Sequence, residues 1–145
     1  MRNRSCGKHP DIRDYGCEPF ICNINHATSM NENFRTTLWT GRDMQFTLMS
    51  IPVCGDIGVE MHSDVDQFIR VESGHARVYM GRCRNDLQEM ACVDRNYAIL
   101  IPAGTWHNIV NVGGCPLKLY SLYAPPQHPF GTVHGTKEDA EHEGH

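Results

Sequence analysis

Short stretches in which apolar and polar residues alternate dominate the chain from Arg35 onward. A period of two is typical of β-strands that bury one face, and no helical spacing near 3.6 residues separates the stretches. Gly, Pro, Asn and Asp residues, which favour turns, bound each stretch. The pattern predicts nine strands, near residues 36–40, 44–51, 57–62, 67–72, 75–80, 87–92, 97–101, 107–112 and 116–123.

The length and spacing of these strands favour an all-β domain over an α/β architecture. A closed or nearly closed antiparallel barrel and a two-sheet jelly roll both fit the pattern. The chain has 145 residues, which is enough for one domain with one hydrophobic core. No internal repeat or low-complexity tract competes with this interpretation.

Three regions differ in the regularity of this pattern. We expect an irregular N-terminal arm at residues 1–25, the barrel at residues 26–126, and a C-terminal loop with an acidic, histidine-containing tail at residues 127–145. The tail should extend beyond the barrel. Residues 25–34 are compatible with one short helical turn, although their Asn and Ser residues are poor helix formers.

The charge and hydropathy of the chain limit the kinds of molecule that it is expected to bind. The formal net charge is -4 and basic residues form no cluster, so the chain has no electrostatic footprint for nucleic acid or an anionic membrane. No apolar run approaches the roughly 20 residues that span a bilayer. The basic residues near the N-terminus precede Pro10, Asp11 and Asp14 rather than an apolar signal. We therefore expect a cytoplasmic protein with a small-molecule partner.

The seven cysteines are an odd number and include no Cys-x-x-Cys pair. This spacing fits neither a disulfide framework nor a zinc knuckle, so we expect free thiols in a reducing compartment. Cys6, Cys17 and Cys22 are the only closely spaced group, and we expect no structural metal there.

Two segments carry potential metal ligands beside turn-forming residues. Glu60 and His62 are two positions apart, so an extended backbone would project both to one side. Pro102 and Gly104 precede His107, so the chain must turn just before this imidazole. A two-histidine centre with one carboxylate is the resulting hypothesis.

Other interpretations of the same residues remain open. His62 and His107 could each be buried histidines with ordinary hydrogen bonds. In another register, Asp64 or Asp66 would ligate the metal together with His62, because both keep its parity along the strand. The sequence around these aspartates is also typical of a turn between two strands.

The segment from Asn96 to Asn111 resembles the second sequence motif of the cupin superfamily. That motif is a Gly, five residues, and then Pro-x-Gly-x-x-His-x-x-x-Asn, which Pro102, Gly104, His107 and Asn111 match. Asn96 occupies the leading Gly position. Since Asn tolerates a left-handed backbone better than other non-glycine residues, this departure is conservative.

The segment from Gly55 to Gly74 resembles the first cupin motif, His-x-His, three or four residues, Glu, six residues and Gly. Glu60 stands at the first histidine position, His62 at the second, and Gln67 at the glutamate position. The resemblance implies a double-stranded β-helix, or jelly-roll barrel, of the small single-domain, phosphomannose-isomerase-like type. It also implies a metal inside the barrel, near its open end, bound by Glu60, His62, Gln67 and His107.

These atoms suit a divalent ion. Two histidines and one carboxylate with open positions are associated with non-haem Fe(II), and Zn, Ni, Mn or Co would accept the same atoms. Ligand identity does not choose among these metals. Gln67 would either ligate through its amide oxygen or hydrogen-bond a bound water or substrate.

Two classes of function follow from such a centre. The first is a metal-dependent enzyme, either an isomerase acting on a sugar or another small carbonyl compound, or a dioxygenase. In the isomerase, Glu60 is the candidate catalytic base if it leaves the metal. The alternative is a non-catalytic small-molecule-binding protein in which the metal orients the ligand or stabilises the barrel.

Several further residues are candidates for supporting roles. Arg35, Arg42 and Arg70 are possible anion contacts, although each is more commonly a solvated surface residue. His128 and His134 follow the last predicted strand and belong either to a lid over the barrel mouth or to an ordinary surface loop.

Alternation after Gln67 also predicts the two faces of one strand. Ile69 and Val71 should point into a largely apolar interior, while Phe68 points outward. Phe68 and Tyr120 could then contribute to a homodimer contact through an exposed sheet face.

Overall fold

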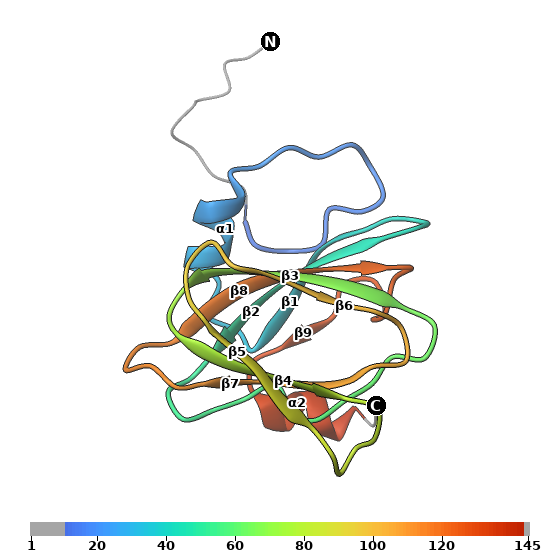
Figure 1. The fold of residues 1–145 in the computed structure, drawn as a ribbon. Coiled ribbons are helices and arrows are strands. Elements are labelled where there is room, and N and C mark those ends of the chain that lie inside the picture. The colour runs from blue at the N-terminus through green and yellow to red at the C-terminus, as the bar shows by residue number, and fades with distance from the viewer. Residues whose placement is uncertain (1–10, 144–145) are drawn as a thin grey trace.

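The computed structural model describes residues 11–143, and within them nine strands form two facing antiparallel sheets (Figure 1). In chain order these are β1 (Arg35–Thr40), β2 (Gln45–Ile51), β3 (Asp66–Ser73), β4 (Ala76–Gly81), β5 (Gln88–Val93), β6 (Ala98–Ile101), β7 (Trp106–Asn111), β8 (Leu117–Ala124) and β9 (Val133–His134). The larger sheet has the order β6-β3-β8-β2-β1-β9, and the smaller has the order β5-β4-β7. The predicted all-β jelly roll is confirmed.

Eight of the nine predicted strands lie within a residue or so of observed ones, but the prediction of a strand at 57–62 is wrong. In place of a ladder, two isolated bridges join this segment to β7, between Asp56 and Val110 and between Glu60 and His107. Gly58 lies between them with φ +94°, a conformation that interrupts a regular ladder. The candidate ligands Glu60 and His62 are therefore carried by a loop that runs along the edge of the smaller sheet.

The main core fills the space between the two sheets. Ile69 and Val71 of β3 point into it, as their alternation with Phe68 predicts, and both are almost fully buried. Ile109 of β7 and Leu119 of β8 meet them from other strands. Because one face of each sheet supplies this core, the polar ligands at its edge lie in a largely apolar environment.

The outer face of the larger sheet is covered by the chain itself. Helix α1 (Ile24–Met30) begins at Asn23, whose side chain accepts a hydrogen bond from the His26 backbone N–H. Together with residues 11–23 it packs over β1, β2 and β8, on the side opposite the smaller sheet (Figure 1). Tyr120, which we expected on an exposed dimer face, is buried there.

A buried carboxylate fixes this N-terminal segment to the barrel. Asp14 accepts hydrogen bonds from the Thr40 hydroxyl at 2.6 Å and from the backbone N–H groups of Gly16 and Gly131 at 2.9 and 3.0 Å. Thr40 in turn accepts from the Gln45 amide. Residues 11–22 are thus ordered by specific contacts, and the prediction of an irregular arm holds only in that they form no helix or strand.

The same network reaches the loop after β8. The Gln45 side chain, fully buried, donates to the His128 carbonyl at 2.8 Å and accepts from the backbone N–H groups of His128 and Gln127. Every polar group of this amide is therefore used, as burial requires. The loop that carries His128 is held in a defined position.

The C-terminal tail does not extend beyond the barrel as predicted. Thr136 and Asp139 form a capping box that begins helix α2 (Lys137–His142). Ala140, on this helix, is 7% exposed and belongs to the main core. The sequence did not predict this contact because Ala140 is the one apolar residue of a helix whose other residues are charged or polar.

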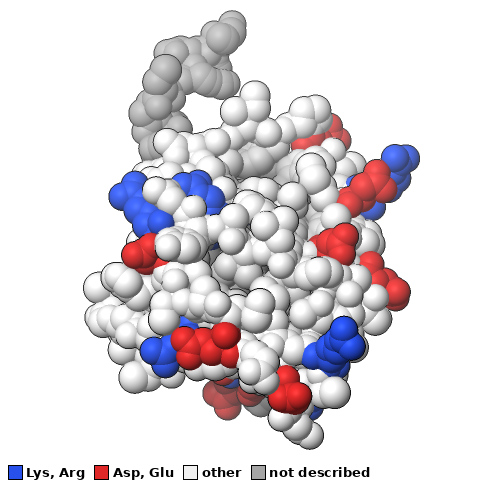
Figure 2. Space-filling view, viewed as in Figure 1, with Lys and Arg blue, Asp and Glu red and all other residues white. Residues whose placement is uncertain are grey.

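The surface shows no large group of like charges on the face in Figure 2, where basic and acidic side chains occur in small mixed groups. Within residues 11–143, neither helix is long enough to cross a membrane. All six cysteines in this part of the chain are free thiols, as predicted. Cys6 lies outside the described residues.

Candidate metal centre

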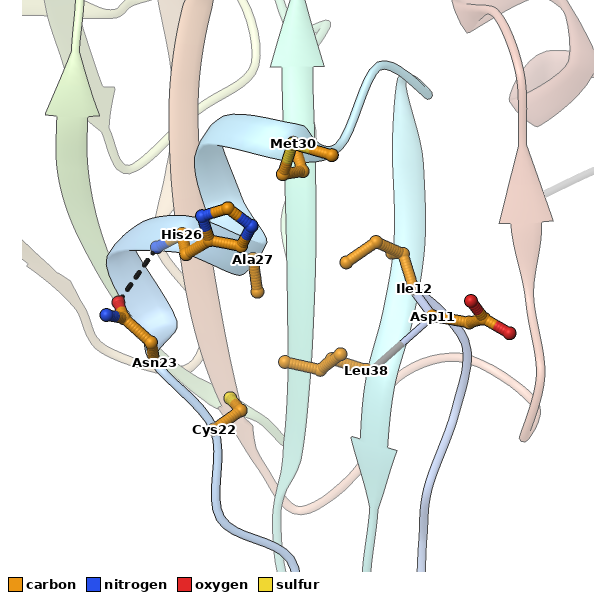
Figure 3. A pocket seen from close by; sticks show the side chains of 8 residues that line it. All are labelled: Asp11, Ile12, Cys22, Asn23, His26, Ala27, Met30 and Leu38. Carbon is orange, nitrogen blue, oxygen red and sulfur yellow. Dashed lines mark hydrogen bonds between the residues drawn. The ribbon is translucent and has the colours of Figure 1, made fainter. Parts of the chain in front are cut away.

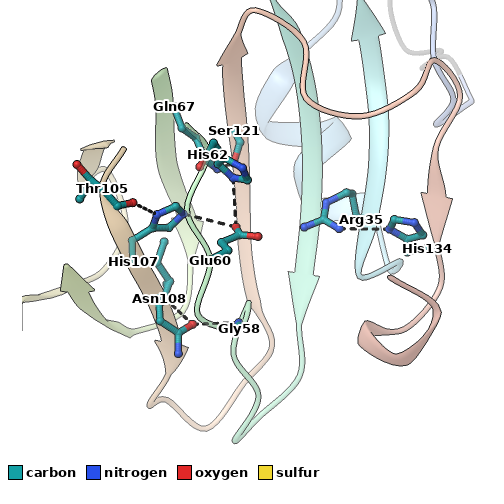
Figure 4. Close-up of polar contacts among 11 residues, drawn as sticks. Arg35, Gly58, Glu60, His62, Gln67, Thr105, His107, Asn108, Ser121 and His134 are labelled. Atoms are coloured by element: carbon teal, nitrogen blue, oxygen red, sulfur yellow. Dashed lines mark hydrogen bonds and ion pairs between the residues drawn. The ribbon is translucent and has the colours of Figure 1, made fainter. Parts of the chain in front are cut away.

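Glu60, His62 and His107 converge on one point at the edge of the barrel interior (Figure 4). Glu60 Oε2 lies 3.6 Å from His62 Nε2 and 3.5 Å from His107 Nε2. One potential ligand atom from each of the three residues lies within 4.8 Å of the other two. Side chains at positions far apart in the sequence thus meet as the sequence predicts.

Backbone hydrogen bonds between the two ligand segments explain this convergence. Glu60 donates to the His107 carbonyl at 3.0 Å, and His107 donates to the Glu60 carbonyl at 2.9 Å. Gly104, with φ +84°, donates to the His62 carbonyl at 2.8 Å. The predicted turn at 102–104 therefore both aims His107 and fixes the loop that carries His62.

The hydrogen bonding of His107 points its other nitrogen at the cluster. Its Nδ1 lies 3.0 Å from the Thr105 carbonyl oxygen, which can only accept, so the proton is on Nδ1. In a neutral ring, Nε2 then presents a lone pair to Oε2 of Glu60. His62 Nε2 and His107 Nε2 are both buried and make no hydrogen bond among the described residues.

The lone pair of His107 Nε2 and the Glu60 carboxylate repel each other unless a positive charge lies between them. A divalent cation satisfies all three atoms at once, and imidazole nitrogen with carboxylate oxygen is a common ligand set for Fe and Zn. The partner of Nδ1 is the kind of outer contact that orients metal-bound histidines. The residues present therefore fit a divalent metal ion.

The electrostatics of Glu60 agree with this role. Burial acts to raise the pKa of its carboxyl group, but the close contacts with the His107 and His62 imidazoles outweigh it and hold the pKa well below the usual range. The group is therefore an anion at neutral pH, as a metal ligand must be.

Gln67, the fourth predicted ligand, is buried on β3, and its amide nitrogen donates to the Ser121 hydroxyl at 3.3 Å. Its Oε1 has no hydrogen-bond partner among the described residues. The alternative register is not supported, because Asp66 accepts from the Ala103 backbone N–H and Asp64 is exposed.

The cluster opens on a cavity of about 310 Å³. Glu60, His62, Arg35 and His128 are among the residues that line it. Helix α2 contributes Ala140 and its neighbours to the same wall. The cavity is therefore bounded by the loop at 57–62, strand β1, the loop after β8 and the C-terminal helix.

Three residues near this cavity are buried, although surface positions were the commoner interpretation from the sequence. His128 and His134 are 8% and 1% exposed, so they are not parts of an ordinary surface loop. Arg35 is 3% exposed, and its Nη1 lies 3.2 Å from His134 Nδ1. Arg42, by contrast, is a solvated residue paired with Asp43.

A second cavity, of about 250 Å³, lies between α1 and the N-terminal segment (Figure 3). Ile12, Ala27, Met30 and Leu38 give it a mainly apolar lining. The three-ligand cluster found among residues 11–143 lies elsewhere, at Glu60. This cavity is therefore not a candidate metal centre.

Comparisons with known proteins identify relatives that match most of the chain. No family model matches the chain. YrkC of Bacillus subtilis (strain 168), an uncharacterized protein, is 56% identical over 89% of this chain and 69% of its own length. The crystal structure of BH2720 from Bacillus halodurans has a TM-score of 0.89 and 55% identity, and covers 90% of this chain and 99% of that one.

More distant structures share the fold alone. The Cnp3 cupin domain of Schizosaccharomyces pombe has a TM-score of 0.55 and 15% identity, and the match covers 63% of this chain and 64% of that one. This similarity concerns the arrangement of the two sheets around the site.

Proposed function

Since the chain has the double-stranded β-helix fold of a cupin domain, we propose that it is a metal-dependent enzyme that transforms a small organic molecule, with an oxygenase as the favoured class. The convergence of Glu60, His62 and His107 beside a cavity carries this proposal. Two histidines and one carboxylate leave positions on a divalent ion for other ligands, and this ligand set is used by non-haem Fe(II) oxygenases. A bound ion would supply Lewis acidity and, as Fe(II), electrons for dioxygen chemistry.

The protein's own residues would bind and orient the reactants. Thr105 holds the His107 ring through Nδ1, and the backbone contacts of Glu60 fix the second ligand segment. Gln67 is proposed as a fourth ligand or as a hydrogen-bond partner of a bound molecule, because its buried Oε1 needs a partner. The apolar core behind the cluster excludes water from one side.

The isomerase alternative requires a base at the site. Glu60 is the candidate, but one oxygen of its carboxylate contacts both imidazoles, so it is committed to the cluster. Proton abstraction would require it to leave these partners. For this reason the oxygenase is the better supported of the two enzyme classes.

Metal titration of tag-free protein tests the proposal. After chelator treatment, Fe(II) under anaerobic conditions, Zn, Ni, Mn and Co should each be measured for stoichiometry and for the shift in Tm. We expect one ion per chain and, at a free concentration 100 times the Kd, about 2.7 kcal/mol of stabilisation. The Tm should then rise by roughly 5–10 °C.

Matched variants identify the site. Glu60→Gln and His62→Gln should abolish the Tm shift, whereas Glu89→Gln and His75→Gln, on exposed residues, should keep it. Oxygen uptake by the Fe(II) form with small-molecule substrates would support the oxygenase, and anaerobic turnover with Zn or Mn would support the isomerase. Metal binding without turnover would favour a non-catalytic binder. If Glu60→Gln binds metal as wild type does, the proposed centre is wrong.

A further inference from the structure

Arg35 is a buried cation that shares the cavity of the candidate metal centre. It lies at the start of β1, where it pairs with Met49 on one side and His134 on the other. Only 3% of it is exposed. In Figure 4 its guanidinium lies between His134 and the side of the barrel that carries Glu60.

The charge of Arg35 has no carboxylate partner among residues 11–143. None of the ion pairs in this part of the chain includes it, and its Nε is buried without a hydrogen bond. The guanidinium stays protonated and can only donate, so His134 Nδ1 accepts from Nη1. The imidazole supports the guanidinium but brings it no negative charge, and the carboxylate next to this imidazole, Glu143, is more than half exposed and contacts Nε2 on the other side of the ring. Burying such a charge is costly unless an anion joins it.

Glu60 is a second charged residue that lines the same cavity. In Figure 4 the Glu60 carboxylate and the Arg35 guanidinium point toward each other. A divalent ion would more than balance the single negative charge of Glu60, so the loaded cavity would carry excess positive charge between the ion and Arg35.

From this arrangement we propose that the ligand of the metal centre is a small organic acid whose carboxylate pairs with Arg35. This inference rests on the proposed function for the metal end of the ligand. The fork of a guanidinium matches a carboxylate, and the edge that carries Nε lacks a partner. The remaining lining includes Phe34, Ile57 and Met61, which suits a short carbon skeleton. A cavity of about 310 Å³ admits only a small molecule.

Calorimetric titration of the metal-loaded protein tests this assignment. The probes are pyruvate, glycolate and malonate, with pyruvamide, glycolamide and inorganic phosphate as comparisons. At least one carboxylate should bind more tightly than its amide by about 10- to 100-fold, the usual effect of a hydrogen-bonded charge. Equal binding of acids and amides, or tighter binding of phosphate than of every acid, would overturn the proposal.

Variants at Arg35 separate a ligand-binding role from a structural one. Arg35→Met removes the charge at similar size, so it should lower carboxylate affinity about 10- to 100-fold while Tm without ligand stays the same or rises. Arg84→Met, at an exposed cavity position, should change affinity less than about threefold. If Arg35→Met does not fold, Arg35→Lys keeps the charge without the fork and should lower affinity at least about tenfold. Unchanged affinity in the folded variant refutes the inference.

The same titration without metal distinguishes the two proposals. If no metal binds at Glu60 but carboxylates still bind through Arg35, the metal centre fails and the anion site stands. If metal binds normally and Arg35→Met has no effect on acids, the anion site fails and the metal centre stands.

Discussion

Asp14→Asn should strongly destabilise the protein, although Asp14 lies far from the candidate metal centre in sequence. The wild-type carboxylate accepts three hydrogen bonds, two of them on Oδ2. An asparagine side chain of the same shape has only one oxygen, so its amide nitrogen must face either the Gly16 N–H or the Gly131 N–H. One buried donor then loses its acceptor, and the remaining bonds lose their charged partner.

The size of the effect follows from these contacts. A hydrogen bond to a charged group contributes about 1.5–3 kcal/mol, and an unsatisfied buried donor costs about 1–3 kcal/mol. These two figures are not added in full, because both include the loss of the same hydrogen bond. We expect the free energy of unfolding to fall by about 2–4 kcal/mol at pH 7. For a domain of this size that is roughly 4–16 °C in Tm. Asp43→Asn, on an exposed ion pair with Arg42, should change stability by less than about 0.5 kcal/mol.

The pH dependence has a definite sign. Burial acts to raise the pKa of Asp14, but hydrogen bonds from Thr40, Gly131 and Gly16 outweigh it and hold the pKa below the ordinary 3.8. A lowered carboxyl pKa stabilises the fold fully above 3.8, and this stabilisation is lost as pH falls through the folded pKa. Urea unfolding of wild type and Asp14→Asn should therefore differ by a constant amount above about pH 5 and converge below 3.8. A loss under 1 kcal/mol, or a difference unchanged down to pH 3, would refute this account.

Three further outcomes are expected. Gly74→Ala should lower stability by about 1–3 kcal/mol in chemical unfolding, because Gly74 has φ +102° and a Cβ there would lie 3.0 Å from the backbone of Leu117, whereas Gly114→Ala meets nothing within 4 Å and should be nearly neutral. Asn111→Ala should cost about 2–4 kcal/mol by the same assay, because its amide donates to three backbone carbonyls; a smaller loss would mean that water replaces these bonds. Light scattering tests the predicted homodimer, whose contact must lie away from Tyr120 because α1 and residues 11–23 cover that face; a mass of one chain would refute the prediction.

The sequence predicted the candidate site where local patterns decide geometry. Alternation placed Ile69 and Val71 in the core, and the turn before His107 set the direction of that side chain. Asn96 has φ +75°, the left-handed conformation expected at its motif position. In each case the neighbouring residues alone restrict the backbone.

The rest depended on contacts between distant segments. The sequence offered Arg35 only as one of three possible anion contacts and did not predict its burial, because residues 35–38 are all buried, both faces of β1 are covered and alternation is lost. Asp14 meets Gly131 across 117 positions, a pairing that no local pattern encodes. The strand predicted at 57–62 failed because Gly58 breaks the ladder between two bridges.

Two isolated β-bridges join residues 56–62 to the smaller sheet in place of a regular ladder. A bound metal ion would therefore add a reversible connection between this segment and β7. It would add to the backbone hydrogen bonds that already join this segment to strand β7, and its departure would loosen the segment while the two sheets stay intact. The order of this segment would then increase with the fraction of sites that hold metal. Hydrogen exchange at the backbone amides of Ile57 and Glu60 should slow as metal binds, so it would measure metal content independently of turnover.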